Sequence, residues 1–317
     1  PRYRQRLAWI PVENHPVWVD DDHFDLGFHV RQSSLPRPGT AAQLQNLCAR
    51  LLERPLDRSR PLWEIWVIEG LEGNRFALHM KVHHCMVDGI AGVDLMAALF
   101  RVTPDTAIDP AAPWTPRPQP GDGDLLRAEM RRRARLSAEA LGSAARWLRG
   151  ERSGTVVDRL ANVVDLVRTG LTRPAATPFN LPIGGNRRVR WLTFDLPAVK
   201  EVKNQLDGTL NDVVLTTVAA AIDRFLERRG VRPTEDLRLG VPVNLQARDG
   251  NRGLGNHIWA WLVPLPAGMR GPIRRFRALQ DATAALKRSQ QALGGEVITS
   301  AFDWTSSNLM PLGAKLL

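Results

Sequence analysis

Prolines are concentrated in one stretch of this chain, and they limit what its 317 residues can fold into. Six lie between residues 104 and 120, at positions 104, 110, 113, 116, 118 and 120. Proline fixes φ and has no backbone N–H, so the stretch favours an extended spacer over a helix or a central strand. We therefore predict a linker at 104–124. It separates an N-terminal α/β part (1–103) from a basic helical segment (125–182) and a second α/β part (183–317).

Before the linker, the pattern predicts a mixed α/β unit. A helix is expected over 41–54, because its leucines share one face and Thr40 is a typical N-cap residue. Segments 62–70 and 75–84 have the composition of two antiparallel strands joined by a short turn. The remaining expected elements are strands at 17–19 and 24–30 and a helix from about 90 to 100.

Beyond the linker, two or three basic helices are expected to about residue 170, followed by a proline-rich turn at 174–182. A further helix is predicted over 209–229, with Thr209 or Asn211 as N-cap and Gly230 past its end. The other expected elements are strands at 188–196, 237–243 and 257–265 and a helix at 272–292. The fold class is thus α/β, with mixed sheets in two units joined by a proline-rich crossover.

The composition excludes several classes of protein. No run approaches the roughly 18 apolar residues of a membrane span, and the first residues do not form a signal peptide. The two cysteines, Cys48 and Cys85, form neither a disulfide framework nor a CxxC site. This usage is typical of a reducing compartment, so we expect a cytoplasmic protein. Because the sequence begins at Pro1 rather than at Met, with a strand-like segment already under way, we expect the chain to be part of a longer protein.

Positive charge is concentrated just after the linker. The formal net charge of the chain is +10, and residues 127–152 hold eight arginines against three glutamates. Apolar residues recur among them at roughly helical spacing, namely Leu126, Met130, Leu136, Leu141, Ala145 and Leu148. A basic amphipathic helix fits a lipid surface or an anionic substrate, and equally a solvated helix face. No nucleic-acid motif accompanies the charge, so no nucleic-acid partner is expected.

The densest chemical signal is the run 83–89, His-His-Cys-Met-Val-Asp-Gly, which ends an apolar segment. Side chains alternate between the two faces of a strand. His84 therefore shares a face with Phe76, whereas His83 shares the other with His79. We expect His84 to face a cleft and His83 to pack or hydrogen-bond within the fold.

Two other uses of this run fit the pattern less well. His79 and His83 would lie about 13 Å apart on a strand, whereas zinc ligands converge at about 2 Å, so no metal is expected. Cys85 points away from the adjacent histidine in an extended chain, and no second signal marks an activated thiol.

GxSxG and Walker A motifs are absent, and 253–255 (GLG) lacks the third glycine of a dinucleotide fingerprint. We expect no bound cofactor.

General-base catalysis fits the run better. A histidine titrates near neutral pH, so it can take a proton from an alcohol as the alcohol oxygen attacks a carbonyl. It can then return that proton to the leaving group. Asp88 in a tight turn, with Gly89 allowing the chain to reverse, is suited to hold the loop that carries such a base.

The run 83–89 and the blocks around it resemble those of a known family. HHxxxDG is the signature of the CoA-dependent acyltransferase superfamily, which includes chloramphenicol acetyltransferase, plant BAHD acyltransferases and peptide-synthetase condensation domains. The surrounding blocks narrow the resemblance to the bacterial wax ester synthase/diacylglycerol acyltransferases. In chain order these blocks are 55–64 (PLDRSRPLWE), 68–71 (IEGL), 81–84 (KVHH), 178–180 (PFN), 211–215 (NDVVL), 241–244 (VPVN) and 255–256 (GN).

The resemblance implies two chloramphenicol-acetyltransferase-like α/β subdomains with the active site at their interface. It implies that His84 is the general base, that His83 and Asp88 support it, and that Gly89 makes the turn. The block 61–63 (Pro61, Leu62, Trp63) is expected to pack rather than to react.

Asn211 and Asp212 have two possible roles under the same resemblance. They either shape the site and stabilise an oxyanion, or simply cap the helix that follows them. The resemblance does not indicate which residues bind CoA.

The activity that the resemblance implies is transfer of a long-chain fatty acyl group from acyl-CoA, as co-substrate, to a fatty alcohol or a diacylglycerol. No covalent intermediate is expected. The protein is expected to associate peripherally with the inner face of the membrane or with lipid inclusions. Two alternatives stay open: another HHxxxDG reaction, such as condensation on a carrier-protein thioester, and a lipid-surface protein whose active site is degenerate.

Overall fold

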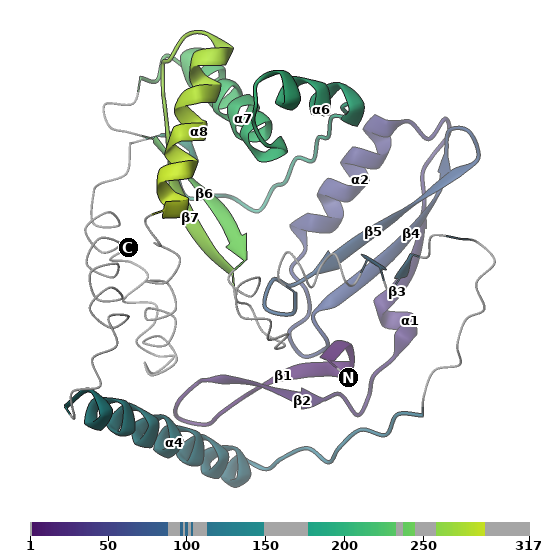
Figure 1. Ribbon diagram of the computed structural model, residues 1–317. Helices are drawn as coiled ribbons and strands as arrows, with labels where there is room; N and C mark the ends of the chain where they lie inside the picture. Colours follow the sequence, from purple (N-terminus) through teal and green to yellow (C-terminus); the bar gives the residue numbers. More distant parts are fainter. Residues whose placement is uncertain are drawn as a thin grey trace.

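The structure of the chain is a computed structural model, shown in Figure 1. It describes residues 2–87, 96–97, 99–100, 103, 113–148, 177–232, 237–244 and 258–288. Within these residues, helices accompany three small sheets, one of which combines parallel and antiparallel pairing. The predicted α/β class with mixed sheets is confirmed.

The first described elements are a 3-10 turn (Arg2–Arg4) and the antiparallel strands β1 (Gln5–Trp9) and β2 (Pro16–Asp20). The strand predicted at 24–30 is wrong for most of its length. The Asp25 carboxylate accepts a hydrogen bond from the Gly27 N–H (2.9 Å) and caps a short helix, α1 (Leu26–His29). Strand β3 (Val30–Ser34) begins only after it. A local cap therefore outweighed the strand-like composition.

The largest sheet has the strand order β3-β4-β5, with β4 (Trp63–Leu71) in the centre and β5 (Arg75–Val82) at one edge. β4 pairs in parallel with β3 and antiparallel with β5. The predicted antiparallel pair is confirmed. In register, Trp63 lies opposite Val82, so the start of β4 adjoins the end of β5.

Helix α2 (Ala41–Glu53) packs on this sheet and begins as predicted. The Thr40 hydroxyl accepts from the Gln43 N–H (3.3 Å), and the Gln43 side chain accepts from the Thr40 N–H (2.6 Å), which forms a capping box. The core between helix and sheet is centred on three buried residues and is extended by half-buried neighbours from α2, β4, β5 and the segment before α6. Its members include Leu35, Cys48, Ile68, Leu44, Leu47, Leu51, Trp66, Ala77 and Val189.

Lys81 joins the C-terminal end of α2 to β5. Its ammonium group donates to the backbone carbonyls of Leu51 (2.9 Å) and Arg54. The last carbonyls of a helix have no partner within the helix. Lys81 therefore satisfies the end of α2 and fixes it against the strand that leads to His83.

Of the linker predicted at 104–124, the structure describes 113–124. Residues 113–121 form neither helix nor strand, whereas 122–124 already belong to a helix. Arg117 attaches the linker to the end of β2, because its guanidinium (3.0 and 3.1 Å) and its backbone N–H (3.0 Å) all donate to the Asp20 carboxylate. These hydrogen bonds hold the pKa of Asp20 well below its usual range.

Of the basic helices predicted after the linker, the structure describes one, α4 (Asp122–Leu148). Its contact with the β1–β2 hairpin is ionic. Glu129 is buried and accepts from Arg132 and Arg133 (2.8 Å each), and Arg133 also donates to Glu13 (2.6 Å). The hydrogen bond from Arg132 contributes most to lowering the pKa of Glu129, to about 2. Met130, predicted on the apolar stripe, is 67% exposed.

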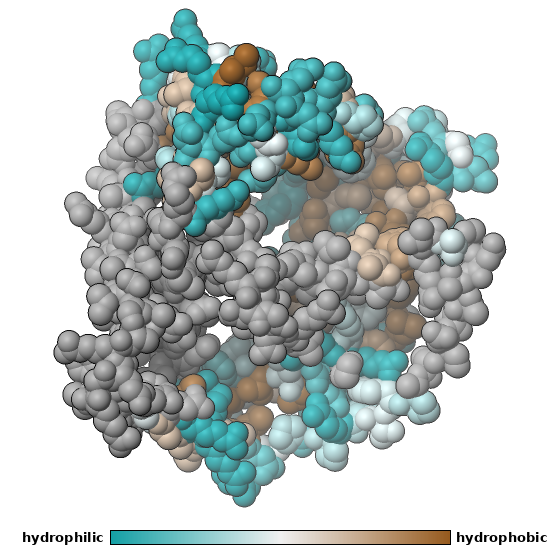
Figure 2. Space-filling view, in the orientation of Figure 1, coloured by the Kyte–Doolittle hydropathy of each residue, from teal (hydrophilic) through white to brown (hydrophobic). Residues whose placement is uncertain are grey.

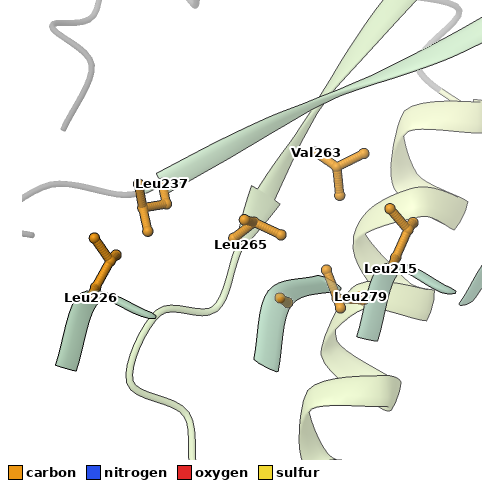
Figure 3. Close-up of a cluster of buried hydrophobic side chains, with 7 residues drawn as sticks. Leu215, Leu226, Leu237, Val263, Leu265 and Leu279 are labelled. Carbon is orange, nitrogen blue, oxygen red and sulfur yellow. The ribbon is translucent and has the colours of Figure 1, made fainter. Parts of the chain in front are cut away.

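The C-terminal unit is formed by α7 (Leu210–Glu227) and α8 (Pro272–Arg288) packed on the hairpin of β6 (Leu237–Asn244) and β7 (Ile258–Leu265). These four elements were predicted, and the structure confirms them. Figure 3 shows aliphatic side chains from both helices and both strands meeting in one core. The buried members of that core are Leu215, Ala219, Leu226, Leu237, Val263, Leu265 and Leu279.

The predicted strand at 188–196 is wrong. Residues 186–195 form neither helix nor strand, and α6 (Leu196–Gln205) begins at the end of the range. The Asp195 carboxylate accepts from the Ala198 N–H (3.1 Å), and Pro197 lies in the first turn of α6. An N-cap aspartate followed by proline is a helix-start signal. Trp191 and Phe194 before it are residue types that favour strands, and they led to the wrong prediction.

Among the helices that the structure describes, none has the length and apolarity needed to cross a membrane. Figure 2 shows mostly hydrophilic side chains on the visible surfaces of the α6–α8 unit and of α4.

Candidate active site

The candidate active site lies where β5 ends. The His83 N–H donates to the Leu62 carbonyl (2.9 Å), which continues the β4–β5 pairing one residue past the strand. On the β4 side, Pro61 and Leu62 are fully buried and Trp63 is 9% exposed. These three residues therefore pack in the interior and hold the backbone at the first histidine of the motif.

Residues 84–86 form a turn directly after this anchor. The Met86 N–H donates to the His83 carbonyl (2.9 Å), and the Cys85 N–H donates to Nδ1 of the His83 ring (3.2 Å). Because Nδ1 accepts a hydrogen bond, the neutral His83 ring carries its proton on Nε2. The His83 ring thus braces the turn that carries His84.

The side chains of both His83 and His84 are exposed, which corrects one expectation. Strand alternation predicted that His84 faces a cleft while His83 packs or hydrogen-bonds within the fold. The strand ends at Val82, however, and a turn does not keep the period of two. His83 differs from His84 by its hydrogen bond within the turn rather than by burial.

Cys85 lies in the same turn and is a free, exposed cysteine. Partial desolvation raises the pKa of its thiol, while the charges of Arg2 and Arg58 act in the opposite direction. At neutral pH the thiol is therefore protonated. A protonated thiol is a poor nucleophile, so the electrostatics favour a noncovalent role for this residue.

Asp88 and Gly89 lie outside the described residues, as do 253–256. Of the predicted acyl-transfer motif, the structure describes 83–87 and brings the turn together with the 61–63 block.

Asp212 lies in the first turn of α7 and is buried (5% exposed). Its carboxylate accepts from the N–H (2.8 Å) and the hydroxyl (2.7 Å) of Thr209, and the Thr209 hydroxyl accepts from the Asp212 N–H (3.2 Å). In this capping box Asp212 caps the helix, which is the second of the two roles considered for it. Asn211 beside it is exposed.

His29 is a functional-site neighbour that sequence reasoning missed. It is fully buried at the end of α1, and its Nδ1–H donates to the Trp63 carbonyl (2.7 Å). Its ring stacks between Phe24 (centroids 5.2 Å apart) and Trp63 (4.5 Å). Burial lowers the pKa of His29, so the ring is neutral in the folded protein. The sequence predicted a strand at 24–30, and nothing in that pattern indicated that His29 contacts Trp63.

Within the described residues, one group of His, Cys and acidic side chains has ligand atoms close together, all within 4.8 Å. It consists of Asp21, Asp22 and His23, in the loop after β2. It includes neither His79 nor His83, the pair weighed as metal ligands from the sequence.

Comparison with known proteins gives consistent matches over most of the chain. The family profile of the wax ester synthase/diacylglycerol acyltransferase catalytic domain matches residues 1–214. A putative diacylglycerol O-acyltransferase of Mycobacterium tuberculosis is 34% identical over 335 aligned residues, covering 100% of this chain and 62% of the relative. A probable diacylglycerol O-acyltransferase of the same species, tgs1, is 35% identical over 299 residues, with 94% and 62% covered. The chain thus spans about 62% of the length of these relatives.

The fold is shared with solved structures. The wax ester synthase/diacylglycerol acyltransferase of Marinobacter aquaeolei VT8 matches with a TM-score of 0.59 at 24% identity, over 92% of this chain and 61% of that one. The first condensation domain of the calcium-dependent antibiotic synthetase, with a substrate analogue, matches with a TM-score of 0.50 at 19% identity, over 92% and 63%. At these identities the likeness concerns the fold alone.

The buried His29 predicts that the folded protein loses stability in mild acid. The unfolded chain binds a proton at His29 near pH 6.5, whereas the native state resists protonation, so stability falls as pH drops below about 6.5. Between pH 7.5 and 5.5, this one group accounts for up to about 1.4 kcal/mol of the loss. Urea unfolding at both pH values measures it, and His29→Gln is expected to show a smaller loss.

The exposed His23 provides the control, because His23→Gln removes a histidine outside the buried cluster of His29, Phe24 and Trp63 and is not expected to reduce the loss as His29→Gln does. Half-buried His79, whose pKa burial also lowers, titrates equally in all three proteins and cancels in the comparison. An unchanged pH dependence in His29→Gln would show that His29 is not the group responsible.

Proposed function

The chain belongs to the wax ester synthase/diacylglycerol acyltransferase family, and we propose on this basis that it transfers a long-chain fatty acyl group from acyl-CoA to a fatty alcohol or a diacylglycerol. The observation that carries the proposal is the histidine turn at the end of β5. Its backbone is anchored on the buried 61–63 block, and it presents an exposed imidazole at His84.

In the proposed reaction, His84 acts as general base. It removes the proton from the acceptor hydroxyl while the hydroxyl oxygen attacks the thioester carbonyl carbon. The tetrahedral intermediate then collapses, the C–S bond breaks, and the proton passes from His84 to the sulfur of CoA. The ester forms without an acyl group on the protein.

The other motif residues have supporting roles in this proposal. His83 holds the turn through its Nδ1, and Asp88 and Gly89 are proposed to complete the same loop. A base that is already fixed before the reaction does not pay the entropy cost of being oriented in the transition state. This contributes to the rate enhancement of about 10²–10⁴ that is typical of a general base.

Replacing the base tests the proposal. His84→Ala is expected to lower turnover of palmitoyl-CoA with hexadecanol or a diacylglycerol by about 10²–10⁴-fold, measured as ester product by mass spectrometry. The same variant should unfold in urea like the wild type, since the His84 side chain is exposed.

Cys85→Ala is the matched control within the same turn and is expected to retain activity. An inactive but folded Cys85→Ala variant would indicate thiol chemistry. Turnover of an acyl-carrier protein in preference to acyl-CoA would favour the carrier-dependent alternative. A folded wild-type chain that binds lipid vesicles but releases no CoA with any acceptor would favour a degenerate site.

We further propose that α4 attaches the protein to an anionic lipid surface, where both the acceptor and the product partition. The face of α4 that holds Glu129 is occupied by ion pairs. On the remaining surface, Arg127, Arg131 and Arg135 recur every four residues with exposed side chains, next to the exposed Met130. Each arginine near an anionic membrane contributes about 1 kcal/mol of attraction.

Reversing two of these charges tests the attachment. Arg131→Glu/Arg135→Glu is expected to weaken binding to phosphatidylglycerol vesicles by at least about tenfold, in a vesicle sedimentation assay. Arg232→Glu/Arg274→Glu makes the same change in net charge at exposed positions of the C-terminal unit and should bind nearly as well as wild type. Equal losses in both variants would attribute binding to net charge rather than to α4.

A further inference from the structure

A depression of about 400 Å³ is lined by the C-terminal half of α2 and by the segment that leads to α6. Its lining is dominated by arginines and includes no residue of the histidine turn. The lining residues are Asn46, Ala49, Arg50, Glu53, Arg187, Arg188 and Arg190.

The sequence of α2 builds one wall. Asn46, Ala49, Arg50 and Glu53 have the spacing i, i+3, i+4 and i+7, so they share one face of the helix. Ala49 is 7% exposed and has no side chain beyond Cβ. This small residue leaves a floor between longer neighbours, and the depression is the result.

Two contacts hold the opposite wall in place. The Arg187 N–H donates to Glu53 Oε1 (3.2 Å), and Val189 packs against the core beneath α2. Arg188 and Arg190 flank Val189 in sequence and line the depression beside α2. The second half of the chain is thus attached to α2 at this point.

The charge of the lining is unbalanced, with four arginines and one glutamate. Within the described residues, the guanidinium groups of Arg187 and Arg190 donate to backbone carbonyls, those of Gly184 (2.6 Å), Asn186 (3.0 Å) and Val189 (2.7 Å). Within the described part of the chain, the side chains of Arg50 and Arg188 make no hydrogen bond or ion pair.

Several arginines of the described chain are paired with acids, as in Arg117–Asp20 (3.0 Å) and Arg133–Glu129 (2.8 Å). Around this depression, four guanidinium groups face a single acidic lining residue, Glu53, and together they create a positive potential. Their planar, multiple N–H donors match phosphate oxygens in geometry and charge. The lining is therefore suited to a ligand that carries several phosphate charges.

The pocket is connected to the histidine turn through α2. Lys81 fixes Leu51 and Arg54, at the same end of the helix, against β5 only two residues before His83. A ligand held by Arg50 is therefore held by the same packed unit that positions the turn.

We infer that this pocket binds the phosphates at the nucleotide end of the acyl donor, the 3′,5′-ADP portion of CoA. The inference rests on the proposed function and deepens it by assigning residues to donor binding. A volume of about 400 Å³ is within the range of small-molecule sites. Binding energy from this non-reacting end of the donor orients the thioester at the turn.

Binding of 3′,5′-ADP to the whole chain, measured by calorimetry, tests the inference without requiring turnover. Arg50→Ser/Arg188→Ser removes one guanidinium group from each wall of the pocket and is expected to raise the Kd at least about tenfold. Arg224→Ser/Arg228→Ser makes the same charge change around another depression, of about 550 Å³ on α7, and should leave the Kd unchanged. Absence of binding to wild type, or equal losses in both variants, would overturn the inference.

Kinetics separate this inference from the proposed function. Arg50→Ser/Arg188→Ser is expected to raise KM for palmitoyl-CoA while leaving turnover of palmitoyl-pantetheine, which lacks the nucleotide, unchanged. His84-dependent turnover with an unchanged KM for palmitoyl-CoA would reject the pocket and keep the function. Arginine-dependent binding of 3′,5′-ADP without any turnover would support the pocket and reject the proposed function.

A lipid headgroup is the other source of phosphate. If the variant binds 3′,5′-ADP like wild type but loses binding to phosphatidylglycerol vesicles, the pocket holds a phospholipid and the nucleotide assignment is wrong. Retained vesicle binding together with lost nucleotide binding supports the assignment.

Discussion

The hydrogen bond from the His83 N–H to the Leu62 carbonyl fixes the point at which β5 stops being a strand. The carbonyl belongs to a backbone that cannot shift easily, because the side chains of Pro61 and Leu62 are fully buried. The next carbonyl, of Trp63, accepts from the buried His29 ring. The exposed histidine turn is therefore attached to one of the best-packed parts of the described chain, which is what a group that must be oriented before reaction requires.

Helix α2 links this anchor to the second half of the chain. One face packs on the sheet through Cys48 and its leucines, and its C-terminal carbonyls are held by Lys81. Glu53 and the core beneath the helix hold the segment around Val189. Figure 1 shows that segment continuing into α6, so α2 is attached both to β5 and to the segment that leads to the C-terminal unit. The arginine-lined pocket is formed where these attachments meet.

Sequence patterns predicted the elements whose signals are local. Thr40 and Thr209 each begin a helix with a capping box, and the cap residue and its partner are only three positions apart. The predicted strand at 188–196 was wrong, because residues 186–195 form neither helix nor strand and the Asp195 cap starts α6 at its last residue. Sequence alternation likewise did not extend past Val82, where a turn replaced the strand.

The site itself was predicted only in part. The motif 83–89 is contiguous, so the sequence contains the catalytic hypothesis and the resemblance that supports it. His29 is 34 residues from Trp63 in sequence, and the pocket joins Arg50 to Arg188 across more than a hundred residues. Such contacts depend on the packing of β4 and α2, which no local pattern encodes.

The central claim is that the acyl group passes directly from donor to acceptor at a histidine turn, with no acyl-protein intermediate. Initial-rate kinetics with the concentrations of palmitoyl-CoA and hexadecanol both varied test it most directly. Direct transfer requires both substrates to be bound together, so double-reciprocal plots are expected to give intersecting lines. Parallel lines, the pattern of a ping-pong reaction through a covalent intermediate, would contradict the account.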